Sequence, residues 1–216
     1  MKETRKPKRQ KLPEPVRRAA ILEAAHKLFN QRGYQQARME DLAAEAGLTK
    51  GGLYFHFKDK RSLFEAVVLD CIAKIDRIIL ESNSRDLDPE SKLSEFFSAM
   101  IQELAGDFQD QSQDSYPGAL EMFFEGHRMM FTKGEIRKIY QRVRCFMSAT
   151  IEQGVREGFF SPRAQPEVSA AGAVAMWVGI YLQYASDPKS FDLREVAQGL
   201  CGIFLDGLRG KVSYEP

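Results

Sequence analysis

The stretch Ala37–Phe57 limits most strongly what this chain folds into, because its pattern predicts two short helices joined by a tight turn. Leu42, Ala43 and Ala46 share one face of the first helix. Gly47 ends that helix, since glycine tolerates the left-handed backbone conformation that helix ends often need. The pattern is therefore that of a helix-turn-helix unit.

The second helix of the pair presents side chains that folding alone explains poorly. Thr49 is a suitable N-cap for it, and Leu53 and Phe57, four residues apart, share its buried face. Three side chains remain on the other faces: Lys50, Tyr54 and His56. A lysine, a tyrosine and a histidine on the outside of a short helix are typical of a helix that docks on the backbone and in a groove of a nucleic acid.

The charge of the chain is divided unevenly, although its net value is only +1. Residues 1–60 hold 14 Lys+Arg and 7 Asp+Glu, a net of +7, whereas residues 61–216 have a net of −6. The basic part contains the helix-turn-helix, as expected of a surface that neutralises phosphates. Residues 1–14 are expected to form a basic, disordered arm, which either adds phosphate or minor-groove contacts or only keeps the chain soluble.

Composition and cysteine usage favour a soluble cytoplasmic protein that does not interact with a membrane. Hydrophobic residues make up 44% of the 216 residues. No apolar stretch reaches the roughly 18 residues of a membrane helix, because the longest candidate, Ala170–Ala185, is too short and contains glycine. Cys71, Cys145 and Cys201 are odd in number and far apart, which is typical of reduced thiols rather than disulfides.

Nothing in the sequence predicts an enzyme, a metal site or a bound cofactor. The three histidines, His26, His56 and His127, fall in different segments. They lack metal-ligand spacing, and the chain contains neither a nucleophile elbow nor a glycine loop that cradles phosphates. We therefore expect no catalytic residues, no metal and no cofactor.

The predicted fold class is all-α, with an N-terminal three-helix domain that carries the helix-turn-helix and a larger C-terminal helical domain. No run alternates with a period of two for long enough to predict a sheet. We place the first domain at 15–60, a connecting helix at 61–83 and the second domain at 84–216, with the polar segment Ser84–Pro89 at the boundary. Further helices are expected near 90–106, 117–131, 134–158, 166–185 and 192–209.

Residues 21–69 resemble the TetR family of bacterial transcriptional regulators. The family pattern is an apolar helix ending in Gly-Tyr, then Asp-apolar-Ala, Ala-Gly-apolar and Leu-Tyr-x-His-Phe, with a lysine shortly after. The matching residues, in the same order and spacing, are Gly33-Tyr34, Asp41-Leu42-Ala43, Ala46-Gly47-Leu48, Leu53-Tyr54-Phe55-His56-Phe57 and Lys60. Agreement at so many positions makes the resemblance specific. It implies a homodimeric DNA-binding protein that responds to a small molecule.

The resemblance also implies roles for single residues. In such proteins the second helix of the pair enters the major groove, its first residues contact bases, and its tyrosine and histidine contact phosphates. Lys50 and Gly51 fall at the base-contacting positions, and Phe55 falls at a variable position that often touches DNA. The expected DNA-binding residues are Arg38, Thr49, Lys50, Gly51, Tyr54, Phe55, His56 and Lys60.

Two departures from the family pattern stand inside this unit. The family usually has threonine where this chain has Ala37 and where it has Gly52, so two hydroxyl groups are missing. Arg38 is expected to supply a phosphate contact by charge instead. Consecutive glycines at 51 and 52 weaken the second helix by roughly 1 kcal/mol each relative to alanine, so we expect that helix to be mobile without DNA.

The second domain is rich in soft, bulky side chains, which suit an adaptable apolar pocket but also form ordinary cores. The resemblance implies a ligand cavity there. The candidate ligand-binding residues are Phe97, Met100, Phe123, His127, Phe146, Trp177 and Tyr181. His127 is either a polar handle in the cavity or a histidine satisfied within the protein. Glu121 and Glu125, four residues apart, either attract a cation or form a solvated helix face.

The last two predicted helices offer an association surface. The helix near 166–185 carries small residues that let a neighbour approach closely, and the helix near 192–209 carries an apolar stripe. Packing within one chain would also account for both faces. The resemblance implies a homodimer through these two helices, and a two-fold dimer reads two half-sites about one helical turn, ~34 Å, apart.

These observations and the resemblance predict a ligand-responsive, sequence-specific transcriptional regulator. The expected partners are a pseudo-palindromic double-stranded DNA operator and a small apolar or aromatic effector that releases a repressor from it. The helix from Asp59 to about Leu80, the only continuous element between the domains, is expected to transmit the change. A transcriptional activator and a DNA-binding protein that responds to no ligand are the alternatives.

Overall fold

The computed structural model describes residues 13–108, 116–131 and 134–210, and every regular element within these ranges is a helix. The all-α fold class is therefore confirmed. The expected basic arm lies almost entirely outside the described residues. The helices are α1 (Glu14–Gln36), α2 (Met39–Glu45), α3 (Lys50–His56), α4 (Lys60–Ser84), α5 (Pro89–Asp107), α6 (Pro117–Phe131), α7 (Glu135–Arg156), α8 (Pro166–Ser186) and α9 (Leu193–Arg209).

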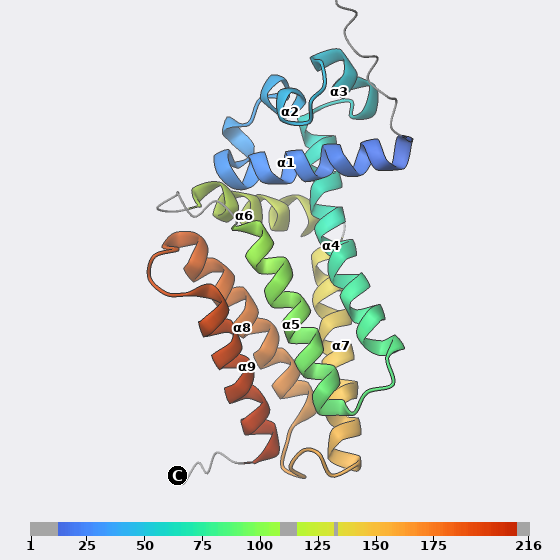
Figure 1. The fold of residues 1–216 in the computed structure, drawn as a ribbon, viewed down its shortest axis with the longest axis vertical. Helices are drawn as coiled ribbons and strands as arrows, with labels where there is room; N and C mark the ends of the chain where they lie inside the picture. The colour runs from blue at the N-terminus through green and yellow to red at the C-terminus, as the bar shows by residue number, and fades with distance from the viewer. Residues whose placement is uncertain (1–12, 109–115, 132–133, 211–216) are drawn as a thin grey trace, which may run out of the picture.

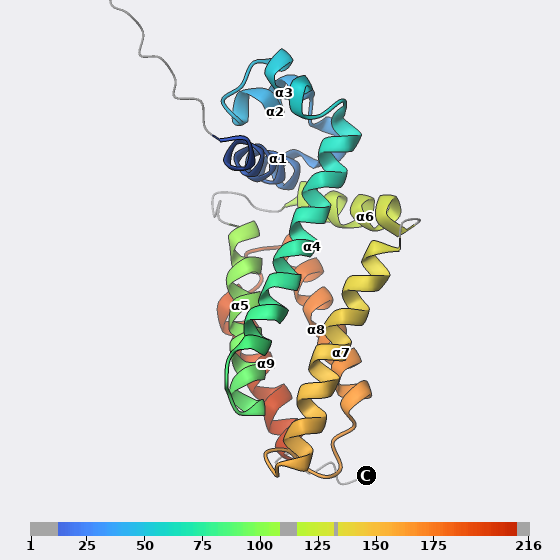
Figure 2. The ribbon, with the colours of Figure 1, turned by 90° about the vertical axis from the view of Figure 1, so that its right-hand side faces the viewer.

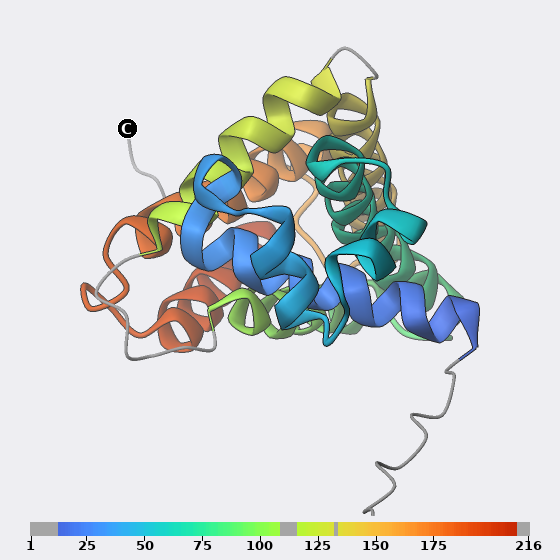
Figure 3. The same cartoon turned by 90° about the horizontal axis from the view of Figure 1, so that it is seen from above.

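The helices form an elongated molecule with a small group at one end. Helices α1, α2 and α3 make up that end, and α4, α5, α7, α8 and α9 run lengthwise through the rest (Figure 1). Helix α6 lies crosswise beneath α1 in both side views (Figure 2). Seen from above, α2 and α3 are nearest the viewer (Figure 3). The helix-turn-helix pair is thus presented at the tip of the molecule.

Local capping signals explain where several helices begin. Asp59 caps α4 in a reciprocal capping box with Ser62. Asp88 accepts from the backbone N–H of Ser91 at the start of α5, where Pro89 occupies the first helical position. The predicted helix at 117–131 is found with the same bounds, and the other four predicted in the C-terminal part agree within two residues. The polar segment predicted as a domain boundary lies between the end of α4 and the start of α5.

The sequence pattern predicts that Gly33 ends the first helix. In the structure Gly33 instead lies at a kink within that helix. Its φ of +76° breaks the helix, and three further residues complete α1. This position requires glycine for two reasons. The positive φ is strained for other residues, and a Cβ there would lie 2.0 Å from Oε2 of Glu121 in α6. The chain therefore approaches α6 closely at the kink.

Helix α6 makes a second connection between the two ends of the molecule. A Cβ on Gly118 would lie within 2.6 Å of backbone atoms of Phe29, Asn30 and Gly33 in α1. Helix α4 also connects the two parts, as predicted: it begins directly after the helix-turn-helix, where Leu63 is buried, and continues among the lengthwise helices. One continuous cluster of buried apolar residues spans both parts. The expectation that α4 alone links them is therefore incomplete.

Helix α8 is strongly apolar, and only a few of its residues are fully buried within the described chain. By length and composition alone α8 is apolar enough to cross a membrane, although the sequence analysis predicts no such helix. Within its most apolar stretch of 18 residues, 28% is buried inside the chain. Val168 of α8 is 65% exposed and Ile203 of α9 is 66% exposed. One helix of this kind is weak evidence for a membrane segment, because a helix that packs against a second protein has the same composition.

Candidate nucleic-acid interface and internal cavity

The helix-turn-helix has the geometry that its sequence predicts. Gly47 has a φ of +65° in the turn, and the Thr49 side chain accepts a 3.1 Å hydrogen bond from the backbone N–H of Gly52. Leu53 and Phe57 are buried. The cap and the two anchors fix which face of α3 points outward, and that face carries Tyr54, 43% exposed, and Phe55, 84% exposed.

The start of α3 is exposed, and its lysine already has a partner. Thr49, Lys50 and Gly51 all lie at the surface. The ammonium of Lys50 forms a 2.5 Å ion pair with Glu40 of α2 and lies 6.0 Å from the ring centre of Tyr54. Lys50 must leave Glu40 before it can reach a base or a phosphate.

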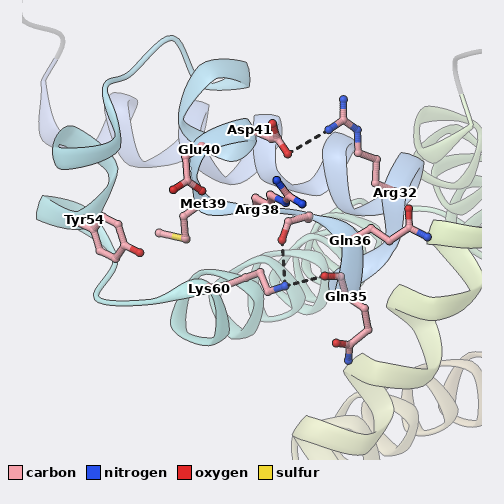
Figure 4. A pocket seen from close by; sticks show the side chains of 10 residues that line it. Arg32, Gln35, Gln36, Arg38, Met39, Glu40, Asp41, Tyr54 and Lys60 are labelled. Carbon is pink, nitrogen blue, oxygen red and sulfur yellow. Dashed lines mark hydrogen bonds and ion pairs between the residues drawn. The ribbon is translucent and has the colours of Figure 1, made fainter.

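An open, polar hollow of about 940 Å³ lies beside this face. Figure 4 shows that its walls come from the end of α1, the start of α2, Tyr54 of α3 and Lys60 of α4. Arg38 is exposed here at the N-cap position of α2, where no side chain caps the helix. The buried Ala37 supplies no hydroxyl group. Arg38 therefore brings positive charge to the hollow and does not cap the helix.

His56 is less accessible than its sequence position predicts. Only 11% of its side chain is exposed, and its Nδ1 lies 3.0 Å from Oε1 of Glu14 at the start of α1. Glu14 lies 42 residues away in the sequence, so no local pattern indicates this pairing. In this arrangement His56 ties the end of α3 to α1, and only a small part of its ring is available to DNA.

Lys60 is held within the protein. Its ammonium donates hydrogen bonds to the backbone carbonyls of Tyr34 at 2.7 Å, Gln35 at 3.1 Å and Ala37 at 3.0 Å. It also lies 4.6 Å from the ring centre of Tyr34, and burial lowers its pKa. An ammonium has three N–H donors, so none is left for a DNA phosphate. In this arrangement Lys60 closes the end of α1, and its expected contact with the DNA backbone stays a prediction.

A partly open cavity of about 260 Å³, here called the internal cavity, is lined by residues of α1, α4, α5, α6, α7 and α8. Five of the predicted ligand residues line it: Met100, Phe123, His127, Trp177 and Tyr181. The other two do not. Phe97, 1% exposed, packs against Trp177 and Phe204, and Phe146, 6% exposed, packs against Phe96. Sequence spacing does not fix the rotation of each helix, so core and cavity residues look alike.

His127 lines the cavity with both ring nitrogens engaged. Nδ1 lies 2.8 Å from the carbonyl oxygen of Phe123, and Nε2 lies 2.8 Å from the hydroxyl of Tyr140. A carbonyl only accepts, so Nδ1 carries the proton and, in the neutral ring, Nε2 accepts from Tyr140. His127 is thus satisfied within the protein, one of the two alternatives that its sequence leaves open.

The polar groups that the sequence analysis missed are His26, Glu103 and Asp107, which also line the cavity. His26 lies in α1, and its Nε2 is 3.5 Å from a carboxylate oxygen of Asp107 in α5. Burial lowers the pKa of His26 to about 4 and raises the pKa of Asp107 to about 7. The only local signal was the i, i+4 spacing of Glu103 and Asp107, which is common on solvated helices.

The other acidic pair, Glu121 and Glu125, has protein partners. Glu121 accepts a hydrogen bond from the backbone N–H of Gln35, and Glu125 forms an ion pair with Arg128 on the same helix. Both carboxylates are therefore used in holding α6 and its surroundings. Neither of the two alternatives considered from the sequence, a cation site or a purely solvated face, describes Glu121.

Known proteins are similar to this chain both in the helix-turn-helix region and over most of its length. Residues 21–67 match the family model described as "Bacterial regulatory proteins, tetR family". The chain is 24% identical over 184 residues to the HTH-type transcriptional repressor BepR of Brucella suis, covering 82% of this chain and 84% of BepR.

Solved structures share the fold. A putative transcriptional regulator from Pseudomonas aeruginosa PAO1 superposes with a TM-score of 0.68 at 22% identity, covering 93% of each chain. AibR, solved in complex with isovaleryl coenzyme A and operator DNA, superposes with a TM-score of 0.62 at 22% identity, covering 87% of this chain and 97% of that one. Residues 21–67 therefore belong to the tetR family of bacterial regulatory proteins, and transcriptional regulators are similar to this chain over most of its length.

Proposed function

We propose that this protein is a cytoplasmic, homodimeric transcriptional repressor that leaves its operator when a small apolar or aromatic molecule enters the internal cavity. The coarser statement, a ligand-responsive DNA-binding transcriptional regulator, follows from its family. One observation carries the proposal: a helix-turn-helix with an exposed aromatic outer face lies directly over helices that line an apolar cavity.

The DNA contacts come mainly from α3 and the hollow beside it. Tyr54 and Phe55 project from α3, Lys50 and Gly51 open the helix, and Arg38 stands at the edge of the hollow. The exposed start of a helix and a lysine suit a nucleic-acid backbone and the edges of bases. His56 and Lys60 support this surface from behind, through Glu14 and the end of α1.

The effector acts through helices that touch both sites. Helix α6 contributes Met122, Phe123 and His127 to the cavity and Gly118 and Glu121 to the contact with α1. A ligand that binds one arrangement of α6 more tightly than the other shifts the protein toward that arrangement. The change reaches the helix-turn-helix through α1 as well as through α4. A coupling of about 1–3 kcal/mol is typical of such linked sites.

Dimerisation completes the proposal. Ala171, Gly172 and Ala175 of α8 and Ile203 of α9 are exposed, and no other described residue covers them. A second copy seated on α8 and α9 would bury them and present two copies of α3 to two half-sites. AibR was crystallised with both a small molecule and operator DNA, which supports one protein serving both partners.

Selection of bound sequences from random duplex DNA tests the proposal. The result expected is a two-fold symmetric motif with half-sites about one helical turn apart, bound by a dimer in sedimentation. An unsymmetrical or absent motif, or a monomer on the DNA, would overturn the homodimeric repressor. The selected operator then serves every titration below.

A further inference from the structure

The cavity is largely apolar, and one group of ionisable side chains at it is here called the acidic cluster: His26 of α1, Lys74 of α4, and Glu103 and Asp107 of α5. Three of the four line the cavity, and Lys74 forms a 2.9 Å ion pair with Glu103. This pairing leaves Asp107 with the imidazole of His26, 3.5 Å away, as its nearest ion-pair contact among the described residues. That distance is too long for a strong hydrogen bond.

The cluster has more hydrogen-bond acceptors and negative charge than its own cation can satisfy. Burial keeps the imidazole of His26 neutral, since its pKa is about 4, so it brings no positive charge to Asp107. The carboxylate of Asp107 is disfavoured by burial and by Glu103, and Lys74 offsets only part of this. An ionised buried carboxylate without a cation is costly. The cluster therefore favours a further positive group, which the described residues do not provide.

A buried amide beside the cluster has the same deficit. Asn30, 3% exposed, places Nδ2 3.4 Å from Nε2 of His26 and 3.5 Å from the carbonyl oxygen of Asp107. Its Oδ1 has no hydrogen-bond partner among the described residues. Buried amide oxygens are normally satisfied. A ligand that carries several N–H donors would serve Asp107 and Glu103, which line the cavity, more fully than one that carries only acceptors.

The rest of the cavity indicates what the remainder of the ligand is made of. The walls contain Phe123, Met100 and the indole of Trp177, which favour an apolar chain or an aromatic ring. A volume of about 260 Å³ lies just below the range of common ligand sites, about 300–1,000 Å³. It suits a small molecule better than a coenzyme A thioester.

We propose that the effector is a small amphipathic cation, an apolar or aromatic molecule whose protonated amine binds between Asp107 and Glu103 beside His26. This rests on the proposed function and specifies the ligand class of its cavity. A carboxylate of the same skeleton would bring a further negative charge to the cluster and is rejected. Because His26 belongs to α1, the bound amine also contacts the segment that carries the helix-turn-helix.

Three probes of one skeleton test the charge requirement: 4-phenylbutylamine, 4-phenylbutanol and 4-phenylbutyrate. Binding is followed at pH 8 by calorimetry and by the fluorescence of Trp177, the single tryptophan of the chain, which lines the cavity. The amine is expected to bind at least tenfold more tightly than the alcohol, and the carboxylate more weakly than the alcohol. Equal affinities, tighter carboxylate binding, or no amine binding at millimolar concentration would overturn the proposal.

Two variants assign the preference to the cluster. Asp107→Asn is expected to reduce amine binding at least tenfold and leave alcohol binding within twofold of wild type. Lys74→Gln removes the cation of the cluster and is expected to strengthen amine binding, a result that a merely damaged cavity would not give. Asp86→Asn, an exposed aspartate between α4 and α5, is the matched control. Unchanged amine binding in Asp107→Asn would overturn the proposal.

Measuring ligand binding and operator release separately distinguishes a wrong ligand class from a wrong proposed function. Operator release is measured separately by fluorescence anisotropy of labelled DNA. If the amine binds but releases no DNA, the ligand class stands and the repressor mechanism fails. If the alcohol or the carboxylate releases DNA and the amine does not, the mechanism stands and the ligand class fails.

Discussion

The backbone N–H of Gln35, in the last turn of α1, donates a 2.7 Å hydrogen bond to Oε1 of Glu121 in α6. The other oxygen of Glu121 occupies the space that a side chain on Gly33 would need. Two residues further along α6, Phe123 lines the internal cavity. One carboxylate therefore ties the kinked end of the first helix to the wall of the cavity.

Glu121→Ala is expected to weaken the coupling between ligand and operator. It removes the hydrogen bond to Gln35 but no atom of the cavity wall, so ligand affinity measured by Trp177 fluorescence stays within twofold. The ligand-induced rise in operator Kd is expected to fall about three- to tenfold, which corresponds to about 1 kcal/mol of coupling. Glu125→Ala, whose ion pair lies within α6, is the matched control. Full ligand response in Glu121→Ala would contradict a route through α6 and α1.

Lys60→Met distinguishes a structural lysine from a phosphate contact. The substitution leaves three backbone carbonyls without their donor, so we expect a loss of about 1–3 kcal/mol in the free energy of unfolding, measured in urea. The slope of log K against log [salt] for operator binding is expected to stay as in wild type. Arg38→Ala should instead lower that slope by about 0.9, as expected for one lost phosphate contact. A lowered slope with unchanged stability in Lys60→Met would reverse the assignment.

Glu40→Gln is expected to strengthen operator binding about two- to fivefold at low salt. It frees Lys50 from its ion pair and removes a negative charge beside the proposed phosphate contacts, so the gain should shrink as salt screens the charges. Anisotropy titrations at two salt concentrations measure it. Glu81→Gln, an exposed glutamate towards the far end of α4, controls for the change in net charge. Equal gains in operator affinity in both variants would show that the ion pair of Glu40 with Lys50 has no specific effect on DNA binding.

Asp107→Asn is expected to change the pH dependence of stability. The pKa of Asp107 is raised from 3.8 to about 7, so the native state holds a proton that the unfolded state releases. The stabilisation from this group is complete below about pH 4 and is lost as pH rises to 7. His26, with its pKa lowered to about 4, acts in the opposite sense over nearly the same range and flattens the wild-type curve.

The difference between variant and wild type isolates the aspartate. Asp107→Asn should match wild type near pH 4 and exceed its free energy of unfolding by about 1–3 kcal/mol at pH 8. Urea denaturation across this range measures it, with Asp86→Asn as control. A difference that does not change with pH would contradict a pKa of Asp107 that burial raises. The charged and titratable groups that act on this site are His26, Asp70, Cys71, Lys74, Glu103 and Tyr181.

The sequence predicted what local chemistry determines. Gly47 in the turn and Thr49 at the cap of α3 depend on neighbours within a few residues, and both were found as expected. His56 and Lys60 were expected at the DNA backbone, but their partners lie 23 to 42 residues away in α1 and the segment after it. No local pattern carries that information.

The cavity was predictable as a kind of site but not residue by residue. Phe97 and Phe123 have the same chemistry, and only the rotation of α5 and α6 in the folded chain separates the core residue from the cavity residue. Asp107 escaped notice because its sequence surroundings are those of a solvated helix end. Its burial depends on α1, which lies more than 70 residues earlier in the chain.

The most direct test of the central claim is the affinity of Tyr54→Ala for the selected operator, measured by anisotropy at fixed salt. Tyr54 is 43% exposed on the outer face of α3, and Phe159→Ala removes an aromatic side chain of 42% exposure in the loop after α7. We expect at least a tenfold loss of affinity for Tyr54→Ala and none for Phe159→Ala. If Tyr54→Ala binds the operator like wild type, α3 does not read the DNA through this face, and the proposed interface is wrong.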